Sequence, residues 1–277
     1  MEQLLRSVNA RLLTGSVLIV LLLGCAANPY RKTNRIYRDH AKELVNQMLA
    51  KPETDSMPPK YWAGTTNFNL RKPNYVVIHH TAQQSCDQTL RTFTLQRTQV
   101  SAHYVICKDG TVHHMLNDAF RAWHGGVGSW GSLTDLNSAS LGIELDNNGS
   151  EPFTEFQLNS LLRVLDTLKK KYQIPTDNFL GHSDIAPVRK VDPNVYFPWK
   201  VLAEKGFGNW YNDTTGIVLP ENFNALRAMR LIGYSIKDTV AAIGAFKRHY
   251  VQDTIRILND ADRKILYSLS EKILKNE

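Results

Sequence analysis

Nine histidines occur in the 277-residue chain, and seven of them lie between residues 79 and 182. A catalytic zinc ion usually takes three protein ligands from His, Asp, Glu or Cys and leaves one position for water. We therefore weigh each of these histidines as a metal ligand for a hydrolase. The set comprises His79, His80, His103, His113, His114, His124 and His182.

His79 directly follows the run Tyr-Val-Val-Ile at residues 75–78, which predicts a strand buried on both faces. A ligand at a strand end is held rigidly beside the sheet. Position alone is equally compatible with a core histidine whose hydrogen bonds are satisfied. Because strand side chains alternate, only one of His79 and His80 can bind a given metal.

His182 is the second residue of the segment GHSDIAP at residues 181–187, and Asp192 follows His182 by ten residues. Prolines at 187 and 193 stiffen this loop. A stiff loop suits a metal site, although an ordinary charged turn would have the same composition. The residues alone thus predict several histidines and one loop that could hold a metal.

Elements that could position these residues alternate between strand and helix. We expect strands at 75–78, 103–106, 112–116 and 141–145, with an Asp-Gly turn joining the second and third. Helices are expected at 88–98 and after Thr154, where Gln157 completes a capping box. This order predicts an α/β fold.

The chain beyond residue 212 changes in character. Residues 223–231, 235–250 and 261–274 have helical periodicity, and Ser235 with Asp238 suggests a second capping box. We expect a small all-helical domain over 213–277, after a first domain over 67–212.

The N-terminus predicts export. Arg6 and Arg11 precede an apolar run from residue 12 to residue 23, too short to span a bilayer and typical of a signal peptide. The run ends in LLGC, which resembles a bacterial lipobox with Cys25 as the lipidated residue. Ala26, which is not Asp, favours delivery to the outer membrane. Residues 1–25 would then be the signal peptide, and 26–66 a tether with a short helix at 40–50.

Two other cysteines, Cys86 and Cys107, would lie in an oxidising compartment, where a disulfide between them is possible. Neither belongs to a C-x-x-C pair, so both are poor zinc ligands. The net charge of +7 is spread along the chain. It indicates a slightly basic surface, compatible with an anionic polymer or membrane, and no nucleic-acid partner.

Six short motifs stand in order along the chain: VIHHTA (77–82), SAHY (101–104), WH (123–124), GIE (142–144), GHSDIAP (181–187) and RKVDP (189–193). Together they resemble the type 2 N-acetylmuramoyl-L-alanine amidases, which share a fold with peptidoglycan recognition proteins and phage amidases. The resemblance covers roughly residues 70–210, and it implies a central mixed β-sheet flanked by helices. The C-terminal helices look, more loosely, like a three-helix peptidoglycan-binding domain.

The resemblance assigns a role to individual positions. His79, His182 and Asp192 match the three zinc ligands, Glu144 matches the catalytic carboxylate, and Lys190 matches a cationic helper. Such a carboxylate can move a proton from water to the leaving amine, and a lysine can stabilise an oxyanion. Substrate contacts are expected from His103, Trp123, His124 and Arg189.

The resemblance therefore implies a zinc amidohydrolase. The expected substrate is the amide between N-acetylmuramic acid, or its anhydro form, and L-alanine in peptidoglycan or muropeptides. An outer-membrane lipoprotein that faces the periplasm of a Gram-negative bacterium, acting as a monomer, is the expected context. The alternative is a peptidoglycan-binding lipoprotein without catalysis. Since both His ligands, Asp192, Glu144 and Lys190 are present, the enzyme is favoured.

Overall fold

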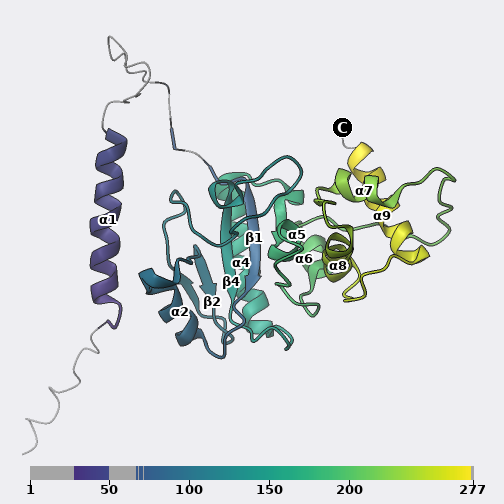
Figure 1. The fold of residues 1–277 in the computed structure, drawn as a ribbon. Helices are drawn as coiled ribbons and strands as arrows, with labels where there is room; N and C mark the ends of the chain where they lie inside the picture. The colour runs from purple at the N-terminus through teal and green to yellow at the C-terminus, as the bar shows by residue number, and fades with distance from the viewer. Residues whose placement is uncertain (1–27, 50–66, 68, 71, 276–277) are drawn as a thin grey trace, which may run out of the picture. The chain divides into compact units, whose positions relative to one another are not determined.

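The computed structural model describes residues 28–49, 67, 69–70 and 72–275. The chain divides into an N-terminal part that ends at Asn67 and a compact unit from Phe68 onward (Figure 1). The predicted signal peptide, Cys25 and Ala26 lie outside the described residues. The predicted domain boundary at 212/213 stays a prediction.

Helix α1, Arg31–Leu49, is the described element of the N-terminal part. It begins nine residues before the predicted helix at 40–50, because its first half is rich in Arg and Lys, which favour helix without adding an apolar stripe. None of its residues is buried. Among the described helices, none combines the length and the apolar character that crossing a bilayer requires.

A five-stranded mixed sheet forms the centre of the compact unit, as predicted. The strands are β1 Tyr75–His80, β2 Tyr104–Ile106, β3 Val112–His114, β4 Ser140–Leu145 and β5 Phe179–Gly181. Their order in the sheet is β3-β2-β4-β1-β5. Strand β1 is parallel to β4 and β5, β2 is parallel to β4, and β3 is antiparallel to β2 at the edge. The short strand β5 has no counterpart among the predicted strands.

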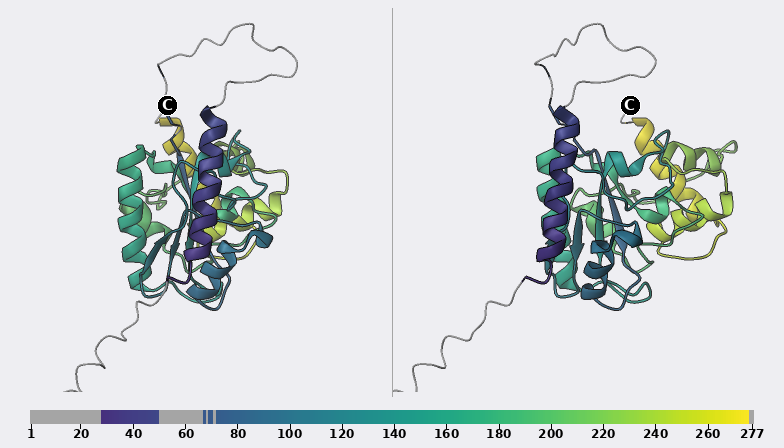
Figure 2. Two further views of the ribbon diagram at one scale, coloured as in Figure 1. Left: turned by 90° about the vertical axis from the view of Figure 1, so that its left-hand side faces the viewer. Right: turned by 60° about the vertical axis from the view of Figure 1, so that its left-hand side comes forward.

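Helix α4, Glu155–Tyr172, covers one face of the sheet (Figure 2). Its predicted capping box between Thr154 and Gln157 is present. Leu161 and Leu165 on α4 pack in one core with Val76 and Ile78 of β1. Burying a side chain of this size stabilises the fold by about 1.5–3 kcal/mol. Because these residues of the strand are buried on this face, the alternate residues must point to the other face.

The other face carries the alternate strand residues. Val77 of β1 packs with residues of two single-turn helices, α3 Leu136–Ala139 and α5 His182–Ile185. By alternation, His79 and Glu144 belong to this face, where packed helices leave room for polar groups. This is the face on which the candidate site lies.

Helix α2, Cys86–Thr94, is shorter than predicted because Leu95 is extended and a 3₁₀ turn, Gln96–Thr98, follows. Ser85 caps its N-terminus by accepting a hydrogen bond from the Gln88 amide. Cys86 is joined to Cys107, just after β2, by a disulfide. The bond ties α2 to the end of the sheet.

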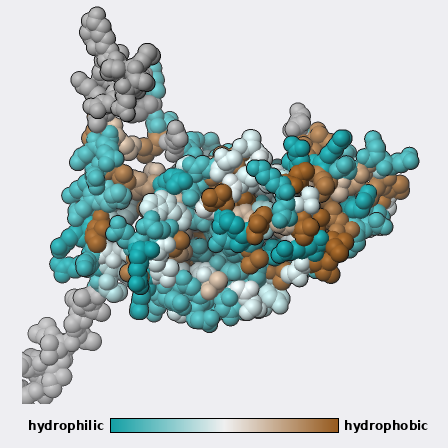
Figure 3. All heavy atoms as spheres, in the orientation of Figure 1, coloured by the Kyte–Doolittle hydropathy of each residue, from teal (hydrophilic) through white to brown (hydrophobic). Residues whose placement is uncertain are grey.

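After α5, the described part of the chain forms four more helices: α6 Trp199–Glu204, α7 Ala225–Ile232, α8 Thr239–Tyr250 and α9 Asp260–Lys275. The last three share a core around Met229, Phe246 and Leu266. The predicted Ser235 cap is wrong: Asp238 is the N-cap, accepting a hydrogen bond from the Ala241 amide, because α8 begins only at Thr239. In the face drawn in Figure 3, apolar residues are most frequent over these C-terminal helices.

Candidate metal and catalytic site

His79 and Glu144 lie on one rung of the sheet. The register of β1 and β4 places Ile78 opposite Ile143 and His79 opposite Glu144. His79 is 1% exposed and Glu144 is 8% exposed. Their separation is therefore set by the spacing of two paired strands, close to the carboxyl ends of a parallel sheet, where crevices usually form.

His182 and Asp192 come to His79 from the loop after β5. His182 is the first residue of α5, and the amide of Ser183 donates a hydrogen bond to the Asp192 carbonyl, which closes the loop. The Nδ1 atoms of His79 and His182 are 2.9 Å apart, and the Asp192 Oδ2 atom lies 3.1 Å and 3.0 Å from them. Three candidate donor atoms thus form a compact triangle.

The tautomer of His182 follows from its other nitrogen. Its Nε2 atom lies 3.0 Å from the carbonyl oxygen of Gly125, which can only accept a hydrogen bond. Nε2 therefore carries the proton in the neutral ring. Nδ1 is left with a lone pair directed at the triangle.

The tautomer of His79 is fixed through a longer chain. Its Nε2 atom lies 3.1 Å from Nδ1 of His124, whose own Nε2 lies 3.2 Å from the hydroxyl of Ser140. That hydroxyl donates to the carbonyl of Leu136 and so must accept from His124. His124 Nδ1 is then an acceptor, His79 Nε2 is the donor, and His79 Nδ1 also presents a lone pair.

Three lone-pair donors therefore converge with no proton assigned between them. Burial, assisted by the neighbouring His182, lowers the pKa of His79 to about 4, so its ring is neutral at pH 7. Two imidazole nitrogens and one carboxylate are a donor set suited to a catalytic zinc ion.

The Glu144 carboxyl faces the same site with one oxygen unused. Its Oε2 atom is buried without a hydrogen-bond partner. Burial, followed by the charge of Asp192, raises the pKa of Glu144 to about 8, while the charge of Lys190 works in the opposite direction. A buried carboxyl with a pKa in this range can exchange a proton near neutral pH.

The expected substrate-contacting residues fall into two groups. His103 and His124 are buried, and His103 is held at both nitrogens, accepting from the Gly142 amide and facing the Phe120 carbonyl. Trp123 is 49% exposed. Arg189 donates to the carbonyls of Gly125 and Val127, so its guanidinium braces the loop that orients His182.

Several positioning groups carried no signal in the sequence. Asn137 accepts hydrogen bonds from the amides of His124 and Gly125 and thereby holds both. Gly142 leaves the space that the His124 ring fills, since a Cβ there would lie 2.3 Å from the ring. In the sequence, His124 and Gly142 were marked only as members of the short motifs WH and GIE, and Asn137 belongs to neither motif.

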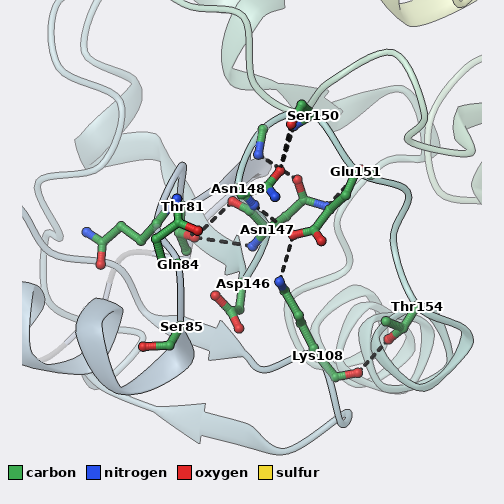
Figure 4. Close-up of polar contacts among 12 residues, drawn as sticks. Thr81, Gln84, Ser85, Lys108, Asp146, Asn147, Asn148, Ser150, Glu151 and Thr154 are labelled. Carbon is green, nitrogen blue, oxygen red and sulfur yellow. Dashed lines mark hydrogen bonds and ion pairs between the residues drawn. The ribbon is translucent and has the colours of Figure 1, made fainter.

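A polar network braces the loop that follows β4 (Figure 4). Thr81, just after β1, exchanges hydrogen bonds with the backbone of Asn147, and Lys108 pairs with Glu151 at 2.7 Å. The Asn147 side chain in turn accepts from Asn194. The ends of β1 and β4 and the segment after Asp192 are therefore held together.

Comparison with known proteins agrees with the fold. The family described as N-acetylmuramoyl-L-alanine amidase (Amidase_2) matches residues 69–195. The amidase AmiD of Escherichia coli is 35% identical over 151 residues, covering 49% of this chain and 54% of AmiD. A 1,6-anhydro-N-acetylmuramyl-L-alanine amidase, AmpD of Haemophilus influenzae, is 37% identical over 107 residues, covering 38% and 58%. The chain thus spans about half the length of these sequence relatives.

A solved structure extends the likeness beyond the sheet. AmiD of E. coli, in complex with the substrate anhydro-N-acetylmuramic acid-L-Ala-D-γ-Glu-L-Lys, superposes with a TM-score of 0.66 at 27% identity. The match covers 78% of this chain and 94% of that one. Residues 69–195 are therefore similar to the N-acetylmuramoyl-L-alanine amidases described by that family.

Proposed function

We propose that this chain hydrolyses the amide bond between N-acetylmuramic acid, or its anhydro form, and the L-alanine of the peptide stem. The proposal rests on three converging lone-pair donors, His79, His182 and Asp192, beside the buried carboxyl of Glu144. It is supported by the printed names of the family and of its relatives AmiD and AmpD.

Zinc held by His79, His182 and Asp192 would lower the pKa of water and polarise the scissile carbonyl. Glu144 accepts the proton of the attacking water on its free oxygen and delivers it to the leaving nitrogen. Lys190 supplies positive charge near the negative charge that develops on the carbonyl oxygen, an effect that can be worth about 3 kcal/mol.

Purified muropeptides analysed by mass spectrometry before and after incubation test this function. We expect separation of the lactyl-alanine amide, and loss of activity with a chelator. Asp192→Ala should lose zinc and activity together, whereas Glu144→Ala should keep zinc and lose most turnover. Cleavage between sugars, or binding of peptidoglycan without any product, would contradict the proposal and favour the binding-protein alternative.

We also propose the context predicted from the sequence: lipidation of Cys25, attachment to the outer membrane and a role in cell-wall turnover in the periplasm. The C-terminal helices would add peptidoglycan contacts, and the protein would act as a monomer. The substitution Cys25→Ser should remove the protein from the outer-membrane fraction, and fractionation of cells that express this variant measures the effect. Unchanged membrane attachment of this variant would contradict lipidation at Cys25.

A further inference from the structure

A buried carboxylate joins the metal-site loop to the C-terminal helices. Asp184, two residues after His182, is 1% exposed. Its Oδ1 atom accepts a hydrogen bond from the Tyr234 hydroxyl at 2.7 Å, and its Oδ2 atom lies 2.8 Å from Nδ1 of His249. Tyr234 follows α7, and His249 lies on α8.

The two partners of Asp184 are themselves fixed by packing. Tyr234 is 2% exposed, and its ring meets Trp130 edge-on at 5.0 Å between centroids. The ring of His249 stacks on Trp199 with centroids 3.9 Å apart and planes inclined by 10°. The position of the Asp184 carboxylate is therefore set from the C-terminal side.

The same carboxylate sets the start of the metal-site loop. Asp184 Oδ2 accepts a hydrogen bond of 2.7 Å from the amide of Gly181, the residue immediately before His182. The backbone at Gly181 is closely packed, because a Cβ there would lie 3.0 Å from the side chains of Pro193 and Trp199. The backbone around His182 is thus clamped between Asp184 and the residue after Asp192.

A second contact holds the far end of the loop. The side-chain amide of Gln252, just after α8, donates to the carbonyls of Val195 and Phe197 at 3.1 Å and 3.2 Å. These carbonyls follow Asp192 by three and five residues. His79, in contrast, is held by the sheet, and its ring lies within hydrogen-bond distance of His182, Asp192 and His124.

We propose that Tyr234 and His249 are positioning residues of the metal site: through Asp184 they fix His182 and Asp192 relative to His79. This inference rests on the proposed function, since it takes these three residues as the zinc ligands. The C-terminal helices then belong to the metal site structurally, whatever else they bind. Groups that orient ligands from outside commonly change metal affinity by about 10–100-fold when mutated.

Zinc affinity, measured by competition with a chromophoric chelator at pH 7.5, tests the inference on the full-length protein without its signal peptide. Tyr234→Phe removes one hydrogen bond at constant shape, and we expect zinc to bind about 10-fold more weakly. His249→Leu should have at least this effect, and His249→Asn, whose amide can replace Nδ1–H, should recover most of the loss. Tyr267→Phe on α9, whose ring contacts Phe223 edge-on, is the matched control and should change affinity less than twofold.

The visible absorption spectrum of the cobalt-substituted protein is a second measurement. A variant that is folded but merely less stable should keep the wild-type spectrum. The visible d–d absorption of Co²⁺ reports ligand geometry, and it should shift in Tyr234→Phe but not in Tyr267→Phe, at a temperature where circular dichroism shows all variants folded. Wild-type affinity and spectrum in both Tyr234→Phe and His249→Leu, with only a lower Tm, would overturn the inference. If the wild type itself bound no zinc, the proposed function would fail, and the inference with it.

Discussion

Burial raises the pKa of Glu144 to about 8, and the nearby charge of Asp192 adds to this effect. In the metal-free protein the carboxyl is therefore mostly protonated at pH 7. A bound dication favours the carboxylate and lowers this pKa. Metal binding should consequently be coupled to loss of a proton from this residue.

Zinc binding to the wild type at pH 7 should release up to about one proton more than zinc binding to Glu144→Gln. At pH 9 the difference should vanish, because Glu144 is already ionised above its pKa of about 8. Titration calorimetry in buffers of different ionisation enthalpy measures both quantities. Equal release by the two proteins at pH 7 would place Glu144 away from the metal.

His124 offers a second prediction for a single residue. His124→Leu removes the acceptor for His79 Nε2–H, so the His79 tautomer is no longer fixed. We expect zinc affinity to fall about 10–100-fold. His124→Gln, which keeps an acceptor, should lose less, and His40→Gln on α1 serves as a control. Equal zinc affinities of His124→Leu and His124→Gln would contradict the tautomer argument.

Elements of the unit are joined at Asp118, whose side chain connects the sheet to the end of α4. It accepts hydrogen bonds from Tyr104 of β2, at 2.7 Å, and from Lys171 and Tyr172 of α4. Burial acts to raise the pKa of Asp118, but these donors prevail and lower it below its usual range. The ionised form is therefore the one that the folded state favours.

Asp118→Asn should reduce the free energy of unfolding by about 1–3 kcal/mol at pH 7, because buried donors lose a charged acceptor. Since the folded-state pKa of Asp118 is depressed, its contribution exists above its ordinary pKa of about 3.9 and disappears as the pH falls further. The difference between wild type and Asp118→Asn should therefore shrink below about pH 4. Urea unfolding at pH 7 and pH 3.5 measures it, and an equal difference at both pH values would refute this explanation.

Periodicity and capping predicted the longer elements, including β1, β4 and α4, because these bury residues at regular intervals. They missed β5, α5 and α6, which are three to six residues long and depend on tertiary contacts. For the site, residue types and spacing alone did not decide whether His79 or His80 is the metal ligand. They also did not favour Asp192 as a ligand over an ordinary turn residue. The contacts of Gly125 and Ser140, which fix the two tautomers, join segments far apart in sequence, so no local pattern could show them.

At the scale of the whole molecule, the candidate ligands, Glu144, Asp184 and the C-terminal helices all belong to the compact unit that starts at Phe68. A protein of residues 67–277 should therefore bind zinc as tightly as a protein of residues 26–277, within about twofold. The same chelator competition provides the measurement. A large loss of affinity would show that the segment before residue 67 takes part in the site.

The shared rung of His79 and Glu144 also bears on how this site can change in evolution. Paired strands keep a spacing of about 4.8 Å whatever loops surround them. Insertions between β1 and β4 can thus reshape the surroundings of the site while leaving that separation intact. A single-residue insertion within either strand would instead turn one of the two side chains to the opposite face. Loop lengths can therefore change during evolution without loss of the site, whereas the lengths of these two strands cannot.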